Sequence, residues 1–254
     1  MNKTVLITGA SSGLGKDFAT LFAEKGYDLV LTARRKKNLE EIGNNLINQF
    51  GIKASIISCD LSDLKSTEEI YNFCEENKIQ INVLVNNAGY GLTNSFEKIS
   101  LKDHIDFVNV LSTSAIALTR LFLPGMIKRN FGRIINVSSV AAFAPFTNSG
   151  GMYIATKLML LKFSEMIHND FKNKNIFSCS VCPGFTHTEF HNEMKEFKSS
   201  IPSFMWMESR TVVEQAYEAS MAGKDIIING WRYKILVFLM KITPKWLVKL
   251  IPGR

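Results

Sequence analysis

Short apolar runs alternate along the chain with longer segments in which apolar residues recur every three or four positions. The short runs are rich in branched aliphatic residues, which is typical of buried strands, and the longer segments have the spacing of amphipathic helices. The predicted strands are residues 5–8, 29–32, 54–58, 83–86, 133–137, 177–182 and 226–228. The predicted helices are residues 16–25, 39–50, 66–77, 103–128, 153–173 and 212–223.

This alternation of strands and helices predicts an α/β fold: a doubly wound sheet of about seven parallel strands with helices on both faces. The chain has 254 residues, of which 46% are hydrophobic, and this can supply one substantial core. The sequence has no internal repeat, low-complexity tract or linker that divides it. We therefore expect one domain.

The first predicted strand leads into a glycine-rich loop, which a predicted helix follows. The loop has the spacing G-x3-G-x-G rather than the commoner G-x-G-x-x-G. Glycines permit tight turns and let a pyrophosphate approach the backbone, and the amides of a helix N-terminus attract its charge. The loop therefore predicts a nucleotide site. Its candidate residues are Gly9, Ser11, Ser12, Gly13, Leu14 and Gly15.

Polar residues follow most of the predicted strands, at the sheet edge where ligands bind in doubly wound folds. Tyr153 and Lys157 begin the helix after the fifth strand and lie one turn apart on the same face. A cation beside a phenol lowers the phenol pKa from about 10 toward neutral pH, which would make Tyr153 a general acid or base. Ser139 precedes Tyr153 by 14 positions, across a loop that could fold over the same site.

Together these residues resemble the short-chain dehydrogenase/reductase family, over nearly the whole chain. The matching motifs occur in the family's order and approximate spacing. They are Thr8-Gly9-x3-Gly13-x-Gly15, Asp60, Asn86-Asn87-Ala88-Gly89, Asn109, Ser139, Tyr153-x3-Lys157 and Pro183-Gly184. The resemblance implies a Rossmann-type sheet. We assign residues 1–230 to the dinucleotide-binding and catalytic domain and residues 231–254 to a C-terminal extension of that domain.

The resemblance also implies catalytic roles. Tyr153 would protonate or deprotonate the substrate oxygen, and Lys157 would lower the Tyr153 pKa and bind the nicotinamide ribose. Ser139 would orient the carbonyl, and Asn109 would hold a water that links Lys157 to solvent. Ser138 is the alternative for the serine role. We prefer Ser139 because the family's serine directly precedes a run of small residues, as Ser139 does here.

Further cofactor contacts are implied in the same way. Asp60 and Leu61 would hold the adenine, and Asn87, Ala88 and Gly89 would lie near the ribose. Pro183 and Gly184 would border the cofactor, while Thr186 and Thr188 would face the carboxamide and the phosphates. Taken from the residues alone, other roles remain open: Asp60 and Thr188 could each cap a helix, and Asn87 could form a turn.

Charge at the end of the second strand predicts which dinucleotide binds. An NAD enzyme would place an acid about 20 residues after the glycine loop, to accept the ribose hydroxyls. This chain has Arg34 and Arg35 there, followed by two lysines. A guanidinium can bind a 2′-phosphate through two hydrogen bonds, whereas an acid would repel it. We therefore predict NADP(H).

The segment 185–210 is expected to form a mobile lid over an apolar substrate, such as a small carbonyl compound or alcohol. His187 and His191 lie in this segment, and we expect neither to be catalytic. The apolar residues expected around the pocket are Phe143, Phe146, Phe190, Phe197, Phe204, Met205, Trp206 and Met207.

The net charge of +7 is concentrated in residues 231–254, which hold six basic residues and no acid. The rest of the chain is nearly neutral, so we predict no nucleic-acid partner. The extension also carries many large apolar residues, but its apolar runs are too short to span a bilayer. Three roles remain open: a lid on the pocket, a subunit interface, or a peripheral membrane contact. A homodimer or homotetramer is expected from the resemblance.

The four cysteines do not indicate a metal or redox site. Cys179 and Cys182 form a C-x2-C pair inside a predicted buried strand, so we predict no metal. The first strand begins too close to residue 1 for a signal peptide, and we expect a cytoplasmic protein, with possible peripheral attachment to a membrane.

The leading hypothesis is an NADP(H)-dependent oxidoreductase that transfers a hydride between the nicotinamide and an apolar carbonyl or alcohol, with reduction as the expected direction. The alternative is a catalytically silent dinucleotide-sensing or scaffolding protein with the same fold. The presence of Ser139, Tyr153 and Lys157 argues against that alternative.

Overall fold

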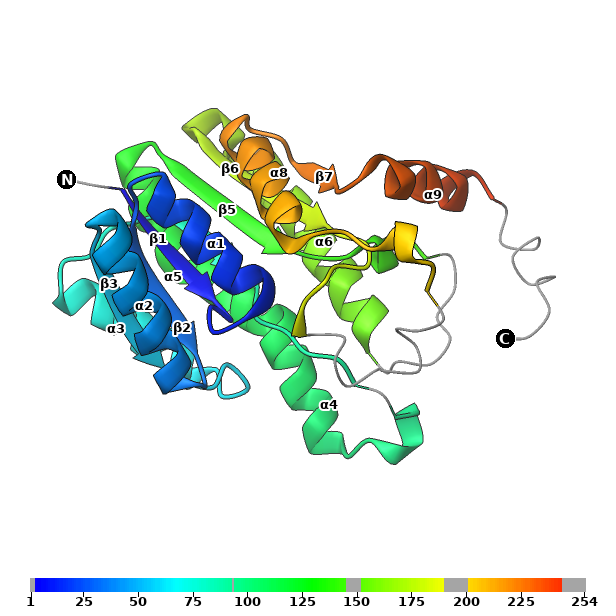
Figure 1. The fold of residues 1–254 in the computed structure, drawn as a ribbon, viewed down its shortest axis with the longest axis horizontal. Helices are drawn as coiled ribbons and strands as arrows, with labels where there is room; N and C mark the ends of the chain where they lie inside the picture. Colours follow the sequence, from blue (N-terminus) through cyan, green and yellow to red (C-terminus); the bar gives the residue numbers. More distant parts are fainter. Residues whose placement is uncertain (1–2, 93, 145–151, 190–200, 244–254) are drawn as a thin grey trace.

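The computed structural model shows one seven-stranded sheet in which every neighbouring pair of strands is parallel (Figure 1). It describes residues 3–92, 94–144, 152–189 and 201–243. The strand order is β3-β2-β1-β4-β5-β6-β7. The bounds are β1 Thr4–Thr8, β2 Asp28–Ala33, β3 Ala54–Ser58, β4 Ile81–Asn86, β5 Gly132–Val137, β6 Ile176–Cys182 and β7 Ile226–Ile228. The predicted fold class is confirmed.

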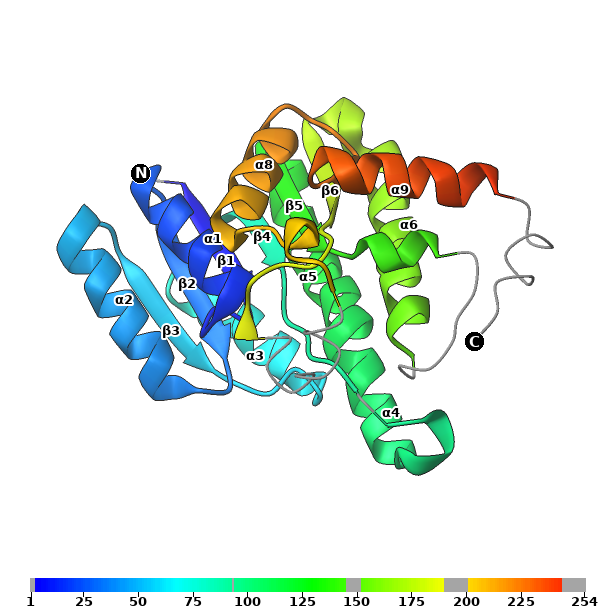
Figure 2. The same cartoon turned by 45° about the vertical axis from the view of Figure 1, so that its right-hand side comes forward.

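Helices cover both faces of the sheet (Figure 2). The helices α1, α2 and α8 supply residues to one buried apolar cluster, and α3, α5 and α6 supply the other. The α-helices are α1 Gly13–Glu24, α2 Lys36–Phe50, α3 Lys65–Glu76, α4 Leu101–Val108, α5 Ser114–Arg129, α6 Tyr153–Phe171, α8 Ser209–Met221 and α9 Trp231–Ile242. Shorter turns are η1 Phe96–Lys98, η2 Asn109–Thr113, η3 Val140–Phe143, η4 Lys172–Lys174 and η6 Ser203–Met205.

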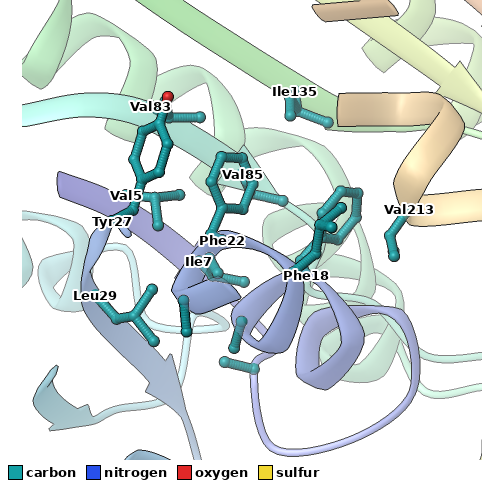
Figure 3. Close-up of a cluster of buried hydrophobic side chains, with 14 of the residues drawn as sticks. Val5, Ile7, Phe18, Phe22, Tyr27, Leu29, Val83, Val85, Ile135 and Val213 are labelled. Atoms are coloured by element: carbon teal, nitrogen blue, oxygen red, sulfur yellow. The ribbon is translucent and has the colours of Figure 1, made fainter. Parts of the chain in front are cut away.

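The central strands alternate their side chains between the two clusters, as the pleat of a strand requires. In β1, Val5 and Ile7 belong to the cluster under α1, whereas Leu6 belongs to the cluster on the opposite face. Figure 3 shows the first cluster, where Phe18 and Phe22 of α1 lie beside apolar side chains of the central strands. The side chains named here are all fully buried: Val5, Leu6, Ile7, Phe18 and Phe22. This two-sided burial explains why the central strands read as continuous apolar runs.

One predicted helix is interrupted. Residues 103–128 were expected to form a single helix, but α4 and α5 are joined by the π-helical turn η2, which begins at Asn109. The whole run Leu101–Arg129 is long and apolar enough to cross a membrane by length and composition. Half of its most apolar stretch is buried inside the protein, and core helices of soluble proteins pass the same test. We therefore treat it as a core helix.

The strand order reverses at β1, whose neighbours β2 and β4 lead to opposite sides of the sheet. Crossover connections therefore leave β1 and β4 in opposite directions, and the carboxyl ends of these strands border a crevice where doubly wound folds bind ligands. The loop after β1, the residues after β4 and the serines after β5 all lie at this edge.

Candidate active site

The glycine loop after β1 is held against the end of β4 by one asparagine and one threonine. The Asn87 side-chain amide donates to the Thr8 carbonyl at 2.9 Å, and the Thr8 hydroxyl accepts from the backbone amides of Asn87 and Ala88. Gly9 has φ +67°, and a Cβ there would lie 2.9 Å from the Ala88 Cα. Only glycine fits this turn. Asn87 thus shapes the loop itself, whatever it contacts in a ligand.

The start of α1 packs directly on this loop. A Cβ on Gly15 would lie 2.1 Å from the Gly9 carbonyl oxygen, far inside any real contact, and a Cβ on Gly13 would lie 3.2 Å from Thr188 Cβ. A hollow of about 390 Å³ opens beside it. The helix N-terminus, the hydroxyls of Ser11 and Ser12 and the Lys16 ammonium on its lining suit the phosphates of a dinucleotide, whereas the carboxylates on the same lining, those of Asp17, Glu41 and Glu189, do not.

The two arginines after β2 differ in position. The Arg35 guanidinium donates to the Ser11 hydroxyl at 3.2 Å and to the Ser12 hydroxyl at 2.6 Å, so it lies over the glycine loop. It also pairs with Glu189 at 3.1 Å. Arg34 is exposed, and its carbonyl accepts a bond from the Ser58 hydroxyl. The structure therefore brings Arg35, and not Arg34, into contact with the predicted nucleotide loop.

Glu189 was not predicted. It lies 154 residues from Arg35 in the sequence, in the segment that follows β6, and its sequence context indicated only a residue near a helix start. Only the return of that segment to the glycine loop reveals the contact.

Of the two predicted residues after β3, the first lies in a turn and the second in the core. Asp60 is exposed, and its carboxylate accepts from the Ser62 backbone amide at 3.0 Å, which forms the turn before α3. Leu61 is buried within the cluster beneath α3 and α5. Asp60 therefore forms a turn and does not cap α3, whose N-cap residue is Leu64. Adenine contact by Asp60 and Leu61 stays a prediction.

Ser139 and Tyr153 meet at the carboxyl end of β5. Ser139 precedes η3, and Tyr153 is the first residue of α6. A hydrogen bond from Ser139 lowers the Tyr153 pKa, but burial has the larger effect and raises it. Ser138 turns the other way: its buried hydroxyl donates to the Lys157 carbonyl at 2.8 Å. The structure thus places Ser139, rather than its neighbour, beside the phenol.

Lys157 is buried one turn beyond Tyr153. Its ammonium donates to the Val137 carbonyl at 2.8 Å, and Nζ lies 5.7 Å from the centre of the Tyr153 ring. Burial lowers the Lys157 pKa from 10.5 to about 8. Burial dominates at the phenol and the amine donates to a backbone carbonyl, so the lowering of the Tyr153 pKa by Lys157 stays a prediction.

Asn109 lies in the π-helical turn between α4 and α5, a type of distortion that often marks functional sites. Its side-chain amide donates to the Ser62 carbonyl at 3.0 Å, so the side chain faces the loop after β3. Its proposed link to Lys157 through water stays a prediction.

The segment after β6 lies between the glycine loop and the C-terminal helix. Thr186 is buried, and its hydroxyl donates to the Gly184 carbonyl at 3.0 Å. Thr188 packs beside Gly13. The Pro183 carbonyl accepts from the Val140 amide at 3.1 Å, which joins the end of β6 to η3. These positions border the predicted cofactor site. Glu189, directly after Thr188, lies in a 3-10 turn, so the capping role left open for Thr188 remains open.

Tyr233 of α9 is a second residue that sequence reasoning did not single out. Its ring occupies the space beside Gly184, where a Cβ would lie 1.9 Å from the ring. Its hydroxyl accepts from the Phe185 amide at 2.9 Å and donates to the Met205 carbonyl at 2.7 Å. Tyr233 therefore ties together both ends of the segment that was expected to form a lid.

Several of the residues expected around an apolar pocket cannot be placed there or take other positions. Phe146, Phe190, His191 and Phe197 lie outside the described residues. The His187 ring stacks on Trp206, with ring centres 4.9 Å apart. Cys179 and Cys182 are buried in β6, and burial raises their pKa values to about 12 and about 11. Neither thiol is therefore ionised near neutral pH.

A family model described as short chain dehydrogenase matches residues 3–199, which run from β1 past the Ser139, Tyr153 and Lys157 cluster. The chain belongs to the short-chain dehydrogenase family. It is thus an oxidoreductase family member by both sequence and fold.

Individual relatives of the short-chain dehydrogenase family extend the comparison. The chain is 30% identical to the very-long-chain 3-oxoacyl-CoA reductase of Rattus norvegicus, over 98% of this chain and 83% of the rat protein. It is 34% identical to the NADP-dependent 3-hydroxy acid dehydrogenase of Schizosaccharomyces pombe, over 74% of this chain and 73% of the yeast protein. A short-chain dehydrogenase from Sphingobium yanoikuyae, solved with NADPH, superposes with a TM-score of 0.83 at 27% identity and covers 99% of this chain and 96% of its own.

The close packing at Gly15 makes a prediction about stability. Gly15→Ala should lower the free energy of unfolding by more than about 2 kcal/mol, because its Cβ would overlap a backbone oxygen that cannot move aside. Gly26→Ala is the matched control: it has φ +76° and open space around it, so it should cost only about 1–2 kcal/mol of backbone strain. Urea unfolding curves measure both. A Gly15→Ala protein as stable as the unmodified one would contradict this packing.

Proposed function

We propose that this protein is an NADP(H)-dependent oxidoreductase that transfers a hydride between the nicotinamide and an apolar carbonyl or alcohol. One observation carries the proposal: Tyr153, its partner Ser139 and the buried ammonium of Lys157 meet at the carboxyl edge of the sheet, the edge that also bears the glycine loop. A phenol, a hydroxyl and an ammonium in that order can hold a carbonyl oxygen and give it a proton.

In the direction of reduction, bound NADPH supplies the hydride to the carbonyl carbon. Tyr153 gives its phenolic proton to the carbonyl oxygen, Ser139 holds that oxygen in place, and the Lys157 ammonium stabilises the phenolate that remains. Burial raises the Tyr153 pKa, so the phenol is protonated at neutral pH before the reaction. A protonated Tyr153 is the form that reduction requires.

Arg35 supports NADP(H) over NAD(H). Two serine hydroxyls of the glycine loop orient its guanidinium, and the residues directly after β2 include no acid that would repel a 2′-phosphate. The Glu189 carboxylate pairs with the guanidinium at 3.1 Å, and a 2′-phosphate would have to displace it. The yeast relative is named as NADP-dependent, and the Sphingobium structure holds NADPH.

The apolar substrate is proposed from the surroundings of the site. Phe143 follows Ser139 in η3, and the Phe185 and Trp206 rings pack together with centres 5.7 Å apart. The rat relative is named for a very-long-chain acyl substrate, which is apolar over most of its length. A silent dinucleotide sensor with the same fold is the competing proposal, and the loss of turnover in the next experiment separates the two.

Tyr153→Phe should lower turnover by orders of magnitude and leave NADPH affinity nearly unchanged, because the ring still packs and only the proton donor is lost. The measurement is NADPH absorbance with a panel of apolar ketones and oxoacyl compounds, with a fluorescence titration for NADPH binding. Tyr71→Phe is a matched control, since Tyr71 packs on Phe122 away from the site. Turnover within a few-fold of the unmodified protein would contradict the role of Tyr153 as proton donor. NADPH binding without turnover on any compound would favour the sensor.

Arg35→Gln should raise the dissociation constant for NADPH by about tenfold or more, since a charge-assisted hydrogen bond contributes about 1.5–3 kcal/mol. The NADH constant should barely change, because NADH lacks the 2′-phosphate. Arg34→Gln is the matched control and should have a much smaller effect, because Arg34 does not contact the glycine loop in the way Arg35 does. Equal affinities of the unmodified protein for NADPH and NADH would refute the assignment of the cofactor.

The Lys157 pKa of about 8 makes cofactor affinity depend on pH. If the ammonium donates to the ribose hydroxyls, binding favours the protonated form. The NADPH dissociation constant should then be flat well below pH 8 and rise above pH 8, by at most about tenfold per pH unit. Lys157→Ala should bind more weakly and lose this rise. A rise that persists in Lys157→Ala would assign the titration to another group.

A further inference from the structure

Helix α9 exposes a continuous apolar stripe. Trp231, Ile235, Phe238, Leu239 and Ile242 are each between 49% and 63% exposed. At about 100° of rotation per residue, these five side chains fall within an arc of about 100° on one face of the helix. Figures 1 and 2 both place α9 at the outer edge of the molecule, and Figure 1 shows it next to β7. Soluble proteins rarely leave such a stripe uncovered.

Buried side chains on the face opposite the apolar stripe fix the orientation of α9. Tyr233 and Val237 are buried, and Tyr233 is bonded to Phe185 and to Met205. The helix therefore cannot turn its apolar stripe inward without breaking these bonds and emptying the space beside Gly184. The stripe faces outward as a consequence of how the helix is anchored.

Cations border the stripe on both sides. Lys234 and Lys241 lie along one border and Arg232 along the other, and all three are exposed. The Arg232 guanidinium lies 4.9 Å from the Trp231 ring and 5.8 Å from the ring of Phe204, itself 58% exposed, so the apolar surface extends onto η6. The sequence from 231 to 254 holds no acidic residue.

These charges indicate which kind of partner covers the apolar stripe. A second copy of the chain would bring the same cations to the same face with no acid in either α9 to pair with them. Residues 244–254 of the chain add Lys245, Lys249 and Arg254, again without an acid. An anionic lipid surface offers both an apolar layer for the stripe and phosphates or carboxylates for the cations on its borders.

We propose that α9 docks this protein on an anionic membrane surface, with the helix lying in the plane of the interface. The stripe enters the region beneath the headgroups, Trp231 lies at headgroup level, and Arg232, Lys234 and Lys241 pair with anionic lipids. The same helix joins both ends of the segment beside the active site through Tyr233.

Sedimentation with vesicles tests the docking. The full-length protein should sediment with phosphatidylcholine vesicles that contain phosphatidylserine, much less with phosphatidylcholine alone, and less as salt is raised. The double variant Ile235→Glu with Phe238→Glu should remain in the supernatant. Leu101→Glu with Ile105→Glu is the matched control, because these α4 residues are 76% and 51% exposed. The control should sediment like the unmodified protein. Thermal unfolding checks that each variant is folded.

A second pair of variants isolates the charges. Replacing Arg232, Lys234 and Lys241 with Gln should reduce the preference for phosphatidylserine several-fold, whereas replacing the exposed Lys65, Lys102 and Lys162 with Gln should not. Because binding is measured without substrate or cofactor, its failure is distinct from a failure of the proposed reductase activity.

Three outcomes would overturn the docking. The first is a full-length protein that does not sediment with any vesicle. The second is light scattering that shows a dimer which the Ile235 and Phe238 variant dissociates, because that result assigns the stripe to a second copy. The third is vesicle binding that is unchanged in the Ile235 and Phe238 variant, because that result assigns the binding to a surface other than the stripe.

Discussion

The close approach of α1 to the carboxyl end of β1 is the constraint on which the site depends. The helix can begin this near the sheet only because position 15 has no side chain, and the loop can turn only because Gly9 takes a positive φ. Asn87 and Thr8 then fix the loop against β4. These contacts bring a helix N-terminus to the same edge as Ser139 and Tyr153, so a dinucleotide and a reacting carbonyl can share one crevice.

Burial determines the electrostatics of that crevice. It raises the Tyr153 pKa and lowers the Lys157 pKa, and in each case it disfavours the charged form. The two groups therefore begin as a neutral phenol and an ammonium that gives up its proton more readily than an exposed lysine. A substrate oxygen that gains negative charge would find both a proton donor and a nearby cation. The sequence pattern suggested that Lys157 acts directly on the phenol, but the structure directs its amine to the Val137 carbonyl.

Much of the fold could be predicted because each strand and helix has its own local pattern of apolar and polar residues. The central strands are buried on both faces and appear as apolar runs, and the Tyr153 and Lys157 spacing already defines one helical face. Contacts between residues far apart in the sequence leave no local pattern and could not be predicted. Arg35 and Glu189 meet only because the segment after β6 returns to the glycine loop. The choice between Ser138 and Ser139 depends on the local direction of the chain entering η3, and the resemblance favoured Ser139 for a different reason.

The geometry of the C-terminal extension could not be predicted from the sequence either. Its composition indicated three roles but no geometry, and the helix α9 became visible only in the structure, with Tyr233 anchored beside Gly184. The proposed function is hydride transfer to a carbonyl carbon. It is tested with NADPH that carries deuterium at the transferred position, with an apolar ketone, and mass spectrometry of the product. We expect an alcohol with one deuterium on the carbinol carbon. Alcohol formed without the label would contradict it, as would the absence of product from every apolar ketone and oxoacyl compound.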